Sequence, residues 1–162
     1  MAKYFLETTA LVKRYKIESG SETVNYLFDN EPQNLFYLNL SIIEVRKTFY
    51  RLWRYPLRQE DSITETEFGS MEARFAADIL TIQRVEFTEE MVGQATKILK
   101  RVWVKNVFDL AQVSAYLIIR EEYPGLKFVS SDIRLIEVAR TFVRDVDIVT
   151  PGLRQGWLFQ GQ

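Results

Sequence analysis

Apolar positions along the chain follow two alternating patterns. Short, nearly continuous apolar runs predict buried strands, whereas longer segments with apolar residues three and four positions apart predict amphipathic helices. The expected strands are residues 3–6, 34–39, 85–87, 126–129 and 146–149. The expected helices are residues 10–16, a segment after Gly20, and residues 41–54, 64–80, 88–102, 108–122 and 132–143.

Strands that alternate with helices predict an α/β protein, because parallel strands need crossover connections to return the chain. We expect a three-layer α/β sandwich, a mainly parallel twisted sheet with helices on both faces, formed by residues 1–162 as a single domain. Residues 151–162 are expected to be a C-terminal tail, and its apolar segment 157–159 either packs on the body or marks a dimer contact. Ligands of such sheets bind beyond the carboxyl ends of the strands.

Helix boundaries are indicated by capping residues. The Thr8-Thr9 pair is expected to cap the first helix, and Thr64 with Glu67 has the spacing of a capping box. Pro56 ends the helix that precedes it.

Composition restricts the chemistry, because the chain has no cysteine and no histidine. Disulfides, thiolate nucleophiles, most zinc sites and Ser–His or Cys–His catalysis are therefore excluded. Any reaction must use carboxylates, hydroxyls, Lys, Arg or a hard metal ion. The net charge of −1 predicts no overall attraction to nucleic acid, so RNA binding would need a local basic patch.

The apolar pattern predicts neither a signal peptide nor a membrane span. The N-terminal apolar stretch is soon interrupted by Glu7, Lys13 and Arg14, and no apolar run approaches the ~20 residues of a membrane span. We expect a cytoplasmic protein that does not enter a membrane.

Four carboxylates, Glu7, Glu44, Asp109 and Asp132, fall at expected strand ends or helix starts. Glu7 directly follows the first strand, where Glu is a poor helix cap, so a functional role is favoured over a solvated turn. Glu44 has a strong alternative, a capping box with Ser41.

Asp109 and Asp132 also have ordinary alternatives. Asp109 shares a helical stripe with Gln112, Tyr116 and Arg120, which could simply be the solvent face of a helix capped by Asn106. Asp132 could be a common helix N-terminal residue.

Together the four positions favour a shared site, because the carboxyl ends of parallel strands meet at one edge of the sheet. Converging carboxylates repel one another and need a counter-charge, which Mg²⁺ or Mn²⁺ supplies. A water bound to such an ion can attack a phosphodiester without histidine.

Four segments of the chain resemble PIN-domain proteins, especially the VapC-type toxins. They are Tyr4-Phe5-Leu6-Glu7-Thr8-Thr9-Ala10-Leu11-Val12-Lys13-Arg14-Tyr15, Ser41-Ile42-Ile43-Glu44-Val45, Asp109-Leu110-Ala111-Gln112-Val113-Ser114-Ala115 and Phe128-Val129-Ser130-Ser131-Asp132-Ile133-Arg134-Leu135. The resemblance implies a metal-dependent endoribonuclease, a homodimer in the cytoplasm that an antitoxin protein holds inactive.

The same resemblance assigns roles to particular side chains. It implies that Glu7, Glu44, Asp109 and Asp132 surround Mg²⁺ or Mn²⁺, and that the hydroxyls of Thr9 and Ser130 orient ligands or water.

Glu7 departs from this family pattern, which has aspartate as the first acid. The additional CH₂ moves the carboxylate outward by about 1.5 Å. Three interpretations follow: an active enzyme with altered metal geometry, a slow enzyme, or an inactive module that binds RNA or protein. A carboxylate-centred phosphatase is a further alternative, although Glu7-Thr8-Thr9 lacks the second acid of an Asp-x-Asp motif.

Two basic clusters are candidates for contacts with RNA, whether single-stranded or structured. The first cluster is interleaved with aromatic residues and contains Arg46, Lys47, Arg51, Arg54 and Arg58. The second contains Lys97, Lys100, Arg101 and Lys105. Basic and aromatic side chains together suit phosphate contact and base stacking. An equally good interpretation of the first cluster is a solvated amphipathic helix that buries Phe49, Leu52 and Trp53, and the same region could instead bind an antitoxin.

Overall fold

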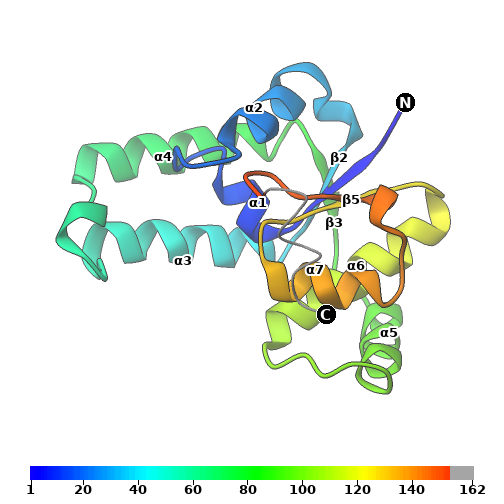
Figure 1. Cartoon of the computed structure of the whole chain (residues 1–162). Helices are drawn as coiled ribbons and strands as arrows, with labels where there is room; N and C mark the ends of the chain where they lie inside the picture. The colour runs from blue at the N-terminus through cyan, green and yellow to red at the C-terminus, as the bar shows by residue number, and fades with distance from the viewer. Residues whose placement is uncertain (154–162) are drawn as a thin grey trace.

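The structure, a computed structural model, describes residues 1–153 and contains a five-stranded parallel sheet (Figure 1). The strands lie in the order β3-β2-β1-β4-β5, and every neighbouring pair is parallel. Their bounds are β1 Tyr4–Leu6, β2 Leu35–Leu38, β3 Gln83–Val85, β4 Lys127–Val129 and β5 Ile148–Val149. The predicted α/β class with a parallel sheet is confirmed.

Helices connect the strands and cover both faces of the sheet. They are α1 Thr8–Val12, α2 Ser21–Asn30, α3 Ser41–Arg54, α4 Glu65–Asp78, α5 Glu89–Leu99, α6 Val107–Glu122 and α7 Ile133–Arg140. Short 3₁₀ turns, η1 Pro32–Asn34, η2 Gln59–Asp61 and η3 Asp145–Asp147, lie between them. In Figure 1, α3 and α4 extend side by side away from the sheet.

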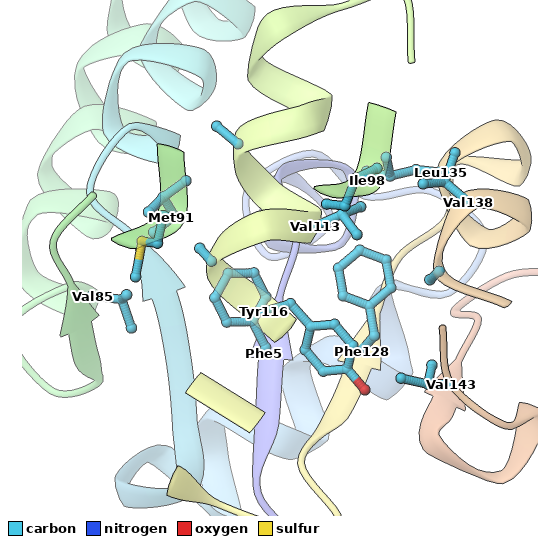
Figure 2. Close-up of a cluster of buried hydrophobic side chains, with 14 of the residues drawn as sticks. Phe5, Val85, Met91, Ile98, Val113, Tyr116, Phe128, Leu135, Val138 and Val143 are labelled. Carbon is cyan, nitrogen blue, oxygen red and sulfur yellow. The ribbon is translucent and has the colours of Figure 1, made fainter. Parts of the chain in front are cut away.

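Alternate residues of β1 belong to different cores, as the two-residue period of a strand requires. Leu6 packs in a cluster built with α1 to α4, whereas Phe5 packs in a cluster built with α5 to α7. In the second cluster the rings of Tyr116 and Phe128 lie 4.9 Å apart, and both contact Phe5 (Figure 2). The central strands β1 and β2 are therefore covered on both faces, which explains why they are continuously apolar, whereas two of the three residues of the edge strand β3 are exposed.

Element boundaries differ from the prediction mainly around β1 and at β3, which spans Gln83–Val85 instead of the expected residues 85–87. Helix α1 begins at Thr8, not Ala10, because Glu7 is its N-cap. It ends at Val12, where the backbone tightens into bonds between residues three apart, such as Lys13 N to the Ala10 carbonyl at 3.1 Å. The Thr64–Glu67 capping box is confirmed.

The strand order places a topological switch point between β1 and β4. The chain moves from β1 outward to β2 and β3, then returns to the other side of β1 through α5 and α6. Parallel sheets of this kind bind ligands beyond the carboxyl ends of the strands at such a point. Glu7 follows β1 and Asp132 lies three residues after β4, so both lie at this edge.

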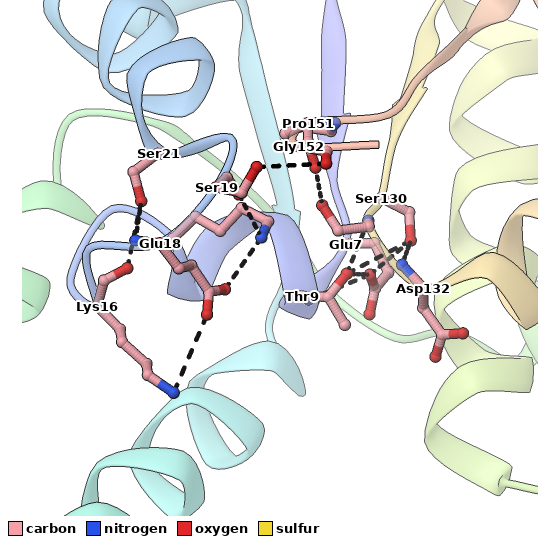
Figure 3. A network of polar contacts seen from close by, with 12 residues as sticks. Glu7, Thr9, Lys16, Glu18, Ser19, Ser21, Ser130, Asp132, Pro151 and Gly152 are labelled. Atoms are coloured by element: carbon pink, nitrogen blue, oxygen red, sulfur yellow. Dashed lines mark hydrogen bonds and ion pairs between the residues drawn. The ribbon is translucent and has the colours of Figure 1, made fainter. Parts of the chain in front are cut away.

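The loop after α1 packs against the turn that follows β5. Gly20 and Gly152 both have positive φ angles, 92° and 78°, and their backbones approach too closely for a β-carbon at either position. Ser19 Oγ donates a hydrogen bond to the Gly152 carbonyl at 3.3 Å (Figure 3). This contact fixes the turn after β5 beside the first βα unit.

Two sequence expectations concern other parts of the molecule. The apolar segment 157–159 lies outside the described residues. Within residues 1–153, no helix has the length and apolar character needed to cross a membrane.

Candidate functional site

Glu7 lies beneath the carboxyl edge of the sheet with only 2% of its surface exposed. Its Oε2 atom accepts hydrogen bonds from the Thr9 backbone N–H at 3.1 Å, from the Thr9 hydroxyl, and from Ser130 Oγ at 2.8 Å (Figure 3). The predicted hydroxyl partners Thr9 and Ser130 therefore both contact Glu7. The alternative of a solvated turn residue is wrong.

Burial dominates the electrostatics of this carboxyl group. The pKa of Glu7 is raised to about 7, mainly by desolvation and in small part by the Glu44 charge, against the lowering effect of the hydrogen bonds from Thr9 and Ser130. Our expectation that Glu would not cap a helix, and that Thr8 and Thr9 would do so, is also wrong. The longer glutamate side chain reaches the first turn of α1 and serves as its N-cap.

Glu44 lies in the first turn of α3, but the capping box predicted as its alternative does not form. Leu40 occupies the cap position, with no side-chain cap, and Ser41 begins the helix. Glu44 Oε1 instead accepts hydrogen bonds from Thr8 Oγ1 at 2.8 Å and Gln112 Nε2 at 3.0 Å. These bonds orient the Glu44 carboxylate toward α1 and α6.

The alternative that Gln112 and Tyr116 lie on the solvent face of α6 is wrong. Both side chains are fully buried. Gln112 Nε2 lies within hydrogen-bond distance of Ser41 Oγ at 2.7 Å, of Thr8 Oγ1 at 3.0 Å and of Glu44. Sequence reasoning missed this buried network. A lone amide inside an otherwise apolar helix was the signal that could have revealed it.

Asp109 is the third residue of α6, whose N-terminus Asn106 caps, as predicted, by accepting from the backbone N–H groups of Phe108 and Asp109. Burial raises the pKa of Asp109 to about 6, the charges of Asp132 and Glu44 raise it further, and Arg134 lowers it. The charges of Glu44 and Asp132 therefore both act on the Asp109 carboxyl group.

Asp132 is the N-cap of α7. Its Oδ1 atom accepts from the backbone N–H groups of Arg134 at 2.9 Å and Leu135 at 3.4 Å. The Asp132 N–H in turn donates to Ser130 Oγ at 3.1 Å, which links this cap to Glu7. The helix N-terminal alternative is thus confirmed, and both cap bonds are accepted by the same oxygen, Oδ1.

Three of the four acids line one cleft of about 370 Å³. α1 supplies its floor, α3 one wall and the start of α6 the other. Asp132 is not among the lining residues, although its charge acts on Asp109. The lining residues are Glu7, Thr8, Thr9, Ile43, Glu44, Lys47, Thr48, Arg51, Asn106, Phe108 and Asp109.

Carboxylates and hydroxyls are the donors that Mg²⁺ and Mn²⁺ prefer, so the donor chemistry of the cleft fits such an ion. In the arrangement seen here, residues 1–153 contain no group of three or more acidic side chains placed to hold a metal ion. Mutual repulsion separates carboxylates that lack a counter-charge. Holding a cation would require Glu44, Asp109 and Asp132 to draw together.

The first basic cluster divides between two environments. Lys47 and Arg51 line the cleft. Arg46 forms an ion pair with Glu72 at 3.2 Å, and the Arg54 guanidinium lies 3.8 Å from the ring centre of Trp53.

The aromatic residues of the first cluster and one cation of the second have structural contacts. Phe49 and Leu52 are buried, and Trp53 is half-buried against Phe68, with ring centres 4.4 Å apart. In the second cluster Arg101 lies over the Phe142 ring at 4.8 Å. Of the two basic clusters, only the first contributes to the described lining of the cleft.

Comparisons with known proteins detect the fold but no close relative. No protein-family model matches the chain, and no curated protein matches it significantly. The chain is similar to FitAcB from Neisseria gonorrhoeae, with 12% identity and a TM-score of 0.62 over 91% of this chain and 97% of that one. It is also similar to PAE2754 from Pyrobaculum aerophilum, with 13% identity and a TM-score of 0.57 over 91% of this chain and 83% of that one.

A third similar structure is VapBC2 from Rickettsia felis bound to a DNA fragment from their promoter. It has 13% identity and a TM-score of 0.54 over 83% of this chain and 92% of that one. At such low identities these similarities establish a shared fold. The chain therefore has the parallel α/β architecture of these proteins, with its acidic cleft at the carboxyl edge of the sheet.

Proposed function

We propose that the protein is a Mg²⁺- or Mn²⁺-dependent endoribonuclease that hydrolyses RNA phosphodiesters as the toxin of a VapBC-type toxin–antitoxin pair. The observation that carries this proposal is the cleft at the switch point, where Glu7, Glu44 and Asp109 lie beside Lys47 and Arg51. Acids that can hold a divalent cation, next to cations that can hold phosphate, are the parts that phosphodiester hydrolysis needs.

Each side chain has a definite part in this proposal. Glu44 and Asp109 would hold the cation from opposite walls, and Asp132 would join them through Oδ2, since Oδ1 accepts its two cap bonds. Thr9 and Ser130 fix the Glu7 carboxyl group below. A bound Mg²⁺ or Mn²⁺ would supply the missing positive charge and an activated water for attack on phosphorus.

Partners belong to the same proposal. The similarity to VapBC2, together with the four VapC-like sequence segments, supports an antitoxin protein as one partner and a second copy of this chain as another. We propose that this complex forms in the cytoplasm.

A second candidate is an inactive module of the same fold that binds RNA or protein. One observation favours it: the Glu7 carboxyl group is buried and already accepts three hydrogen bonds through one oxygen. A glutamate that serves mainly to stabilise the start of α1 could leave the cleft with too few ligands for catalysis.

Cleavage of a mixed single-stranded RNA pool with Mn²⁺ or Mg²⁺ tests the first candidate. Asp132→Asn is a suitable control, because asparagine caps helices as well as aspartate and should leave α7 intact. We expect metal-dependent cleavage that chelation abolishes and that the variant loses. Folded protein that leaves the RNA uncut at high concentration would contradict the nuclease.

Glu7→Asp separates the two candidates. Shortening the side chain by about 1.5 Å withdraws the carboxylate from Ser130, so for an active glutamate-based site we expect cleavage to fall at least tenfold. A large rise in cleavage would instead show that glutamate had weakened an aspartate site. Urea denaturation of both proteins separates this effect from unfolding.

A further inference from the structure

We propose that the α3 wall of the cleft is a binding track for single-stranded RNA, with Lys47 and Arg51 contacting successive backbone phosphates and Phe108 stacking on a base. This inference deepens the proposed function and names the residues that select the substrate. Arg46 and Arg54, from the same basic cluster, have no part in the track.

Helical spacing aligns the two cations with the acidic end of the cleft. Glu44, Lys47 and Arg51 line the same cleft from successive turns of α3. Lys47 and Arg51 are separated by about 6 Å along the helix axis, since each residue rises about 1.5 Å. A phosphate bound to a cation that Glu44 and Asp109 hold would therefore be followed along α3 by two cationic positions.

The two cations of the track are available for a ligand. Lys47 and Arg51 are exposed, and among residues 1–153 neither has a hydrogen-bond or ion-pair partner. Arg46 is instead paired with Glu72, and Arg54 lies against Trp53. Two cations of this cluster thus line the cleft without a partner, which is the arrangement expected of phosphate contacts.

Apolar side chains complete the track. Phe108 lies at the start of α6 with 37% of its surface exposed, and Ile43 on α3 is 59% exposed, and both line the cleft. Aromatic faces beside a cationic groove bind unpaired bases by stacking, which is independent of sequence. Because stacking needs unpaired bases, this cleft of about 370 Å³ favours a single strand over a duplex.

Binding must be measured without cleavage and without divalent metal. A background of Asp109→Asn with Asp132→Asn removes two negative charges from this region and keeps the α7 cap. Fluorescence anisotropy with an end-labelled, mixed-sequence 12-nucleotide RNA, across a series of NaCl concentrations, then gives both affinity and salt dependence. The probe is roughly the length that one single-strand-binding domain covers.

The expected result is different for track and control residues. Lys47→Ala and Arg51→Ala should each reduce the slope of log affinity against log salt by about 0.7, the value for one phosphate contact in a single strand. Phe108→Ala should weaken binding about tenfold with an unchanged slope. Arg46→Ala and Arg54→Ala should bind as the background does, and a duplex of the same sequence should bind more weakly.

Other outcomes separate the track from the nuclease. Slopes unchanged in Lys47→Ala and Arg51→Ala, or equal losses in Arg46→Ala and Arg54→Ala, would overturn the track even if the parent protein cuts RNA. No RNA binding at low salt would also overturn it and leave an acidic protein as the ligand of these cations. The expected slopes from a protein that never cuts RNA would support the track and refute the nuclease.

Discussion

Glu7→Gln tests whether the fold places an ionisable group where its charge is unfavourable. Glu7 is 2% exposed, and burial raises its pKa to about 7 from an ordinary 4.5. Glutamine has nearly the same shape and cannot ionise. Its side-chain oxygen can accept the hydrogen bonds that Thr9 and Ser130 donate to Glu7 Oε2.

The magnitude follows from linkage between folding and protonation. The folded protein binds the Glu7 proton more tightly than the unfolded chain, so the stability gained is full below about pH 4.5 and is lost as pH rises through about 7. The two pKa values differ by about 2.5, which corresponds to about 3 kcal/mol. We therefore expect Glu7→Gln to be more stable than the parent at pH 8, by up to about 3 kcal/mol, and no more stable at pH 4.5.

Urea denaturation at several values between pH 4.5 and 8, in a metal chelator, measures this difference. Glu60→Gln, at an exposed position in η2, controls for the general effect of removing one negative charge. A stability difference between Glu7→Gln and the parent that does not change with pH would refute the reasoning. So would a glutamine variant that is less stable than the parent at pH 8.

Three other substitutions test separate parts of the structure. Gln112→Leu leaves buried hydroxyls and a carboxylate without their amide donor, so we expect a loss of about 1–3 kcal/mol in urea denaturation and at least tenfold weaker Mn²⁺ binding in calorimetry. Gly152→Ala should destabilise the fold more than Gly125→Ala. Both glycines have a positive φ angle, but only a β-carbon at position 152 would collide with the Ser19 carbonyl. Equal melting temperatures of the two variants would contradict this packing. Tyr116→Phe removes a hydroxyl that donates to a buried backbone carbonyl at 2.9 Å, and should cost about 1 kcal/mol, with no change in stability as the contrary result.

The fold could be predicted because its signals are local and repeated. Most strands are short and apolar, and each of the first four is followed by a helix, so the parallel sheet follows from the rules of chain connection. Boundaries were less accurate where a side chain overrides propensity. Glu7 starts α1 two residues early, and η3 shortens the last strand to Ile148–Val149.

The candidate site was harder to predict, because its geometry depends on contacts between distant segments. The position of all four acids at the same edge follows from the topology, and the cleft contains three of them. The glutamine beneath Glu44 could not be placed without knowing that this side of α6 faces α1 and α3. The division of the basic cluster likewise depends on α4, since Glu72 neutralises Arg46 and leaves Lys47 for the cleft.

The four acids also show why capping and function are not exclusive alternatives. In a parallel α/β fold each helix starts near the carboxyl end of a strand, so an acid at this edge also meets free N–H groups and the positive end of a helix dipole. Glu7 accepts such an N–H group through Oε2 and Asp132 accepts two through Oδ1, whereas Glu44 makes no cap bond and is held by Thr8 and Gln112. The helix starts therefore stabilise a concentration of negative charge that mutual repulsion would otherwise disfavour. A fold that gathers helix N-termini at one edge thereby gathers acids there, and the same acids can serve as caps in the free protein and as ligands when a cation binds.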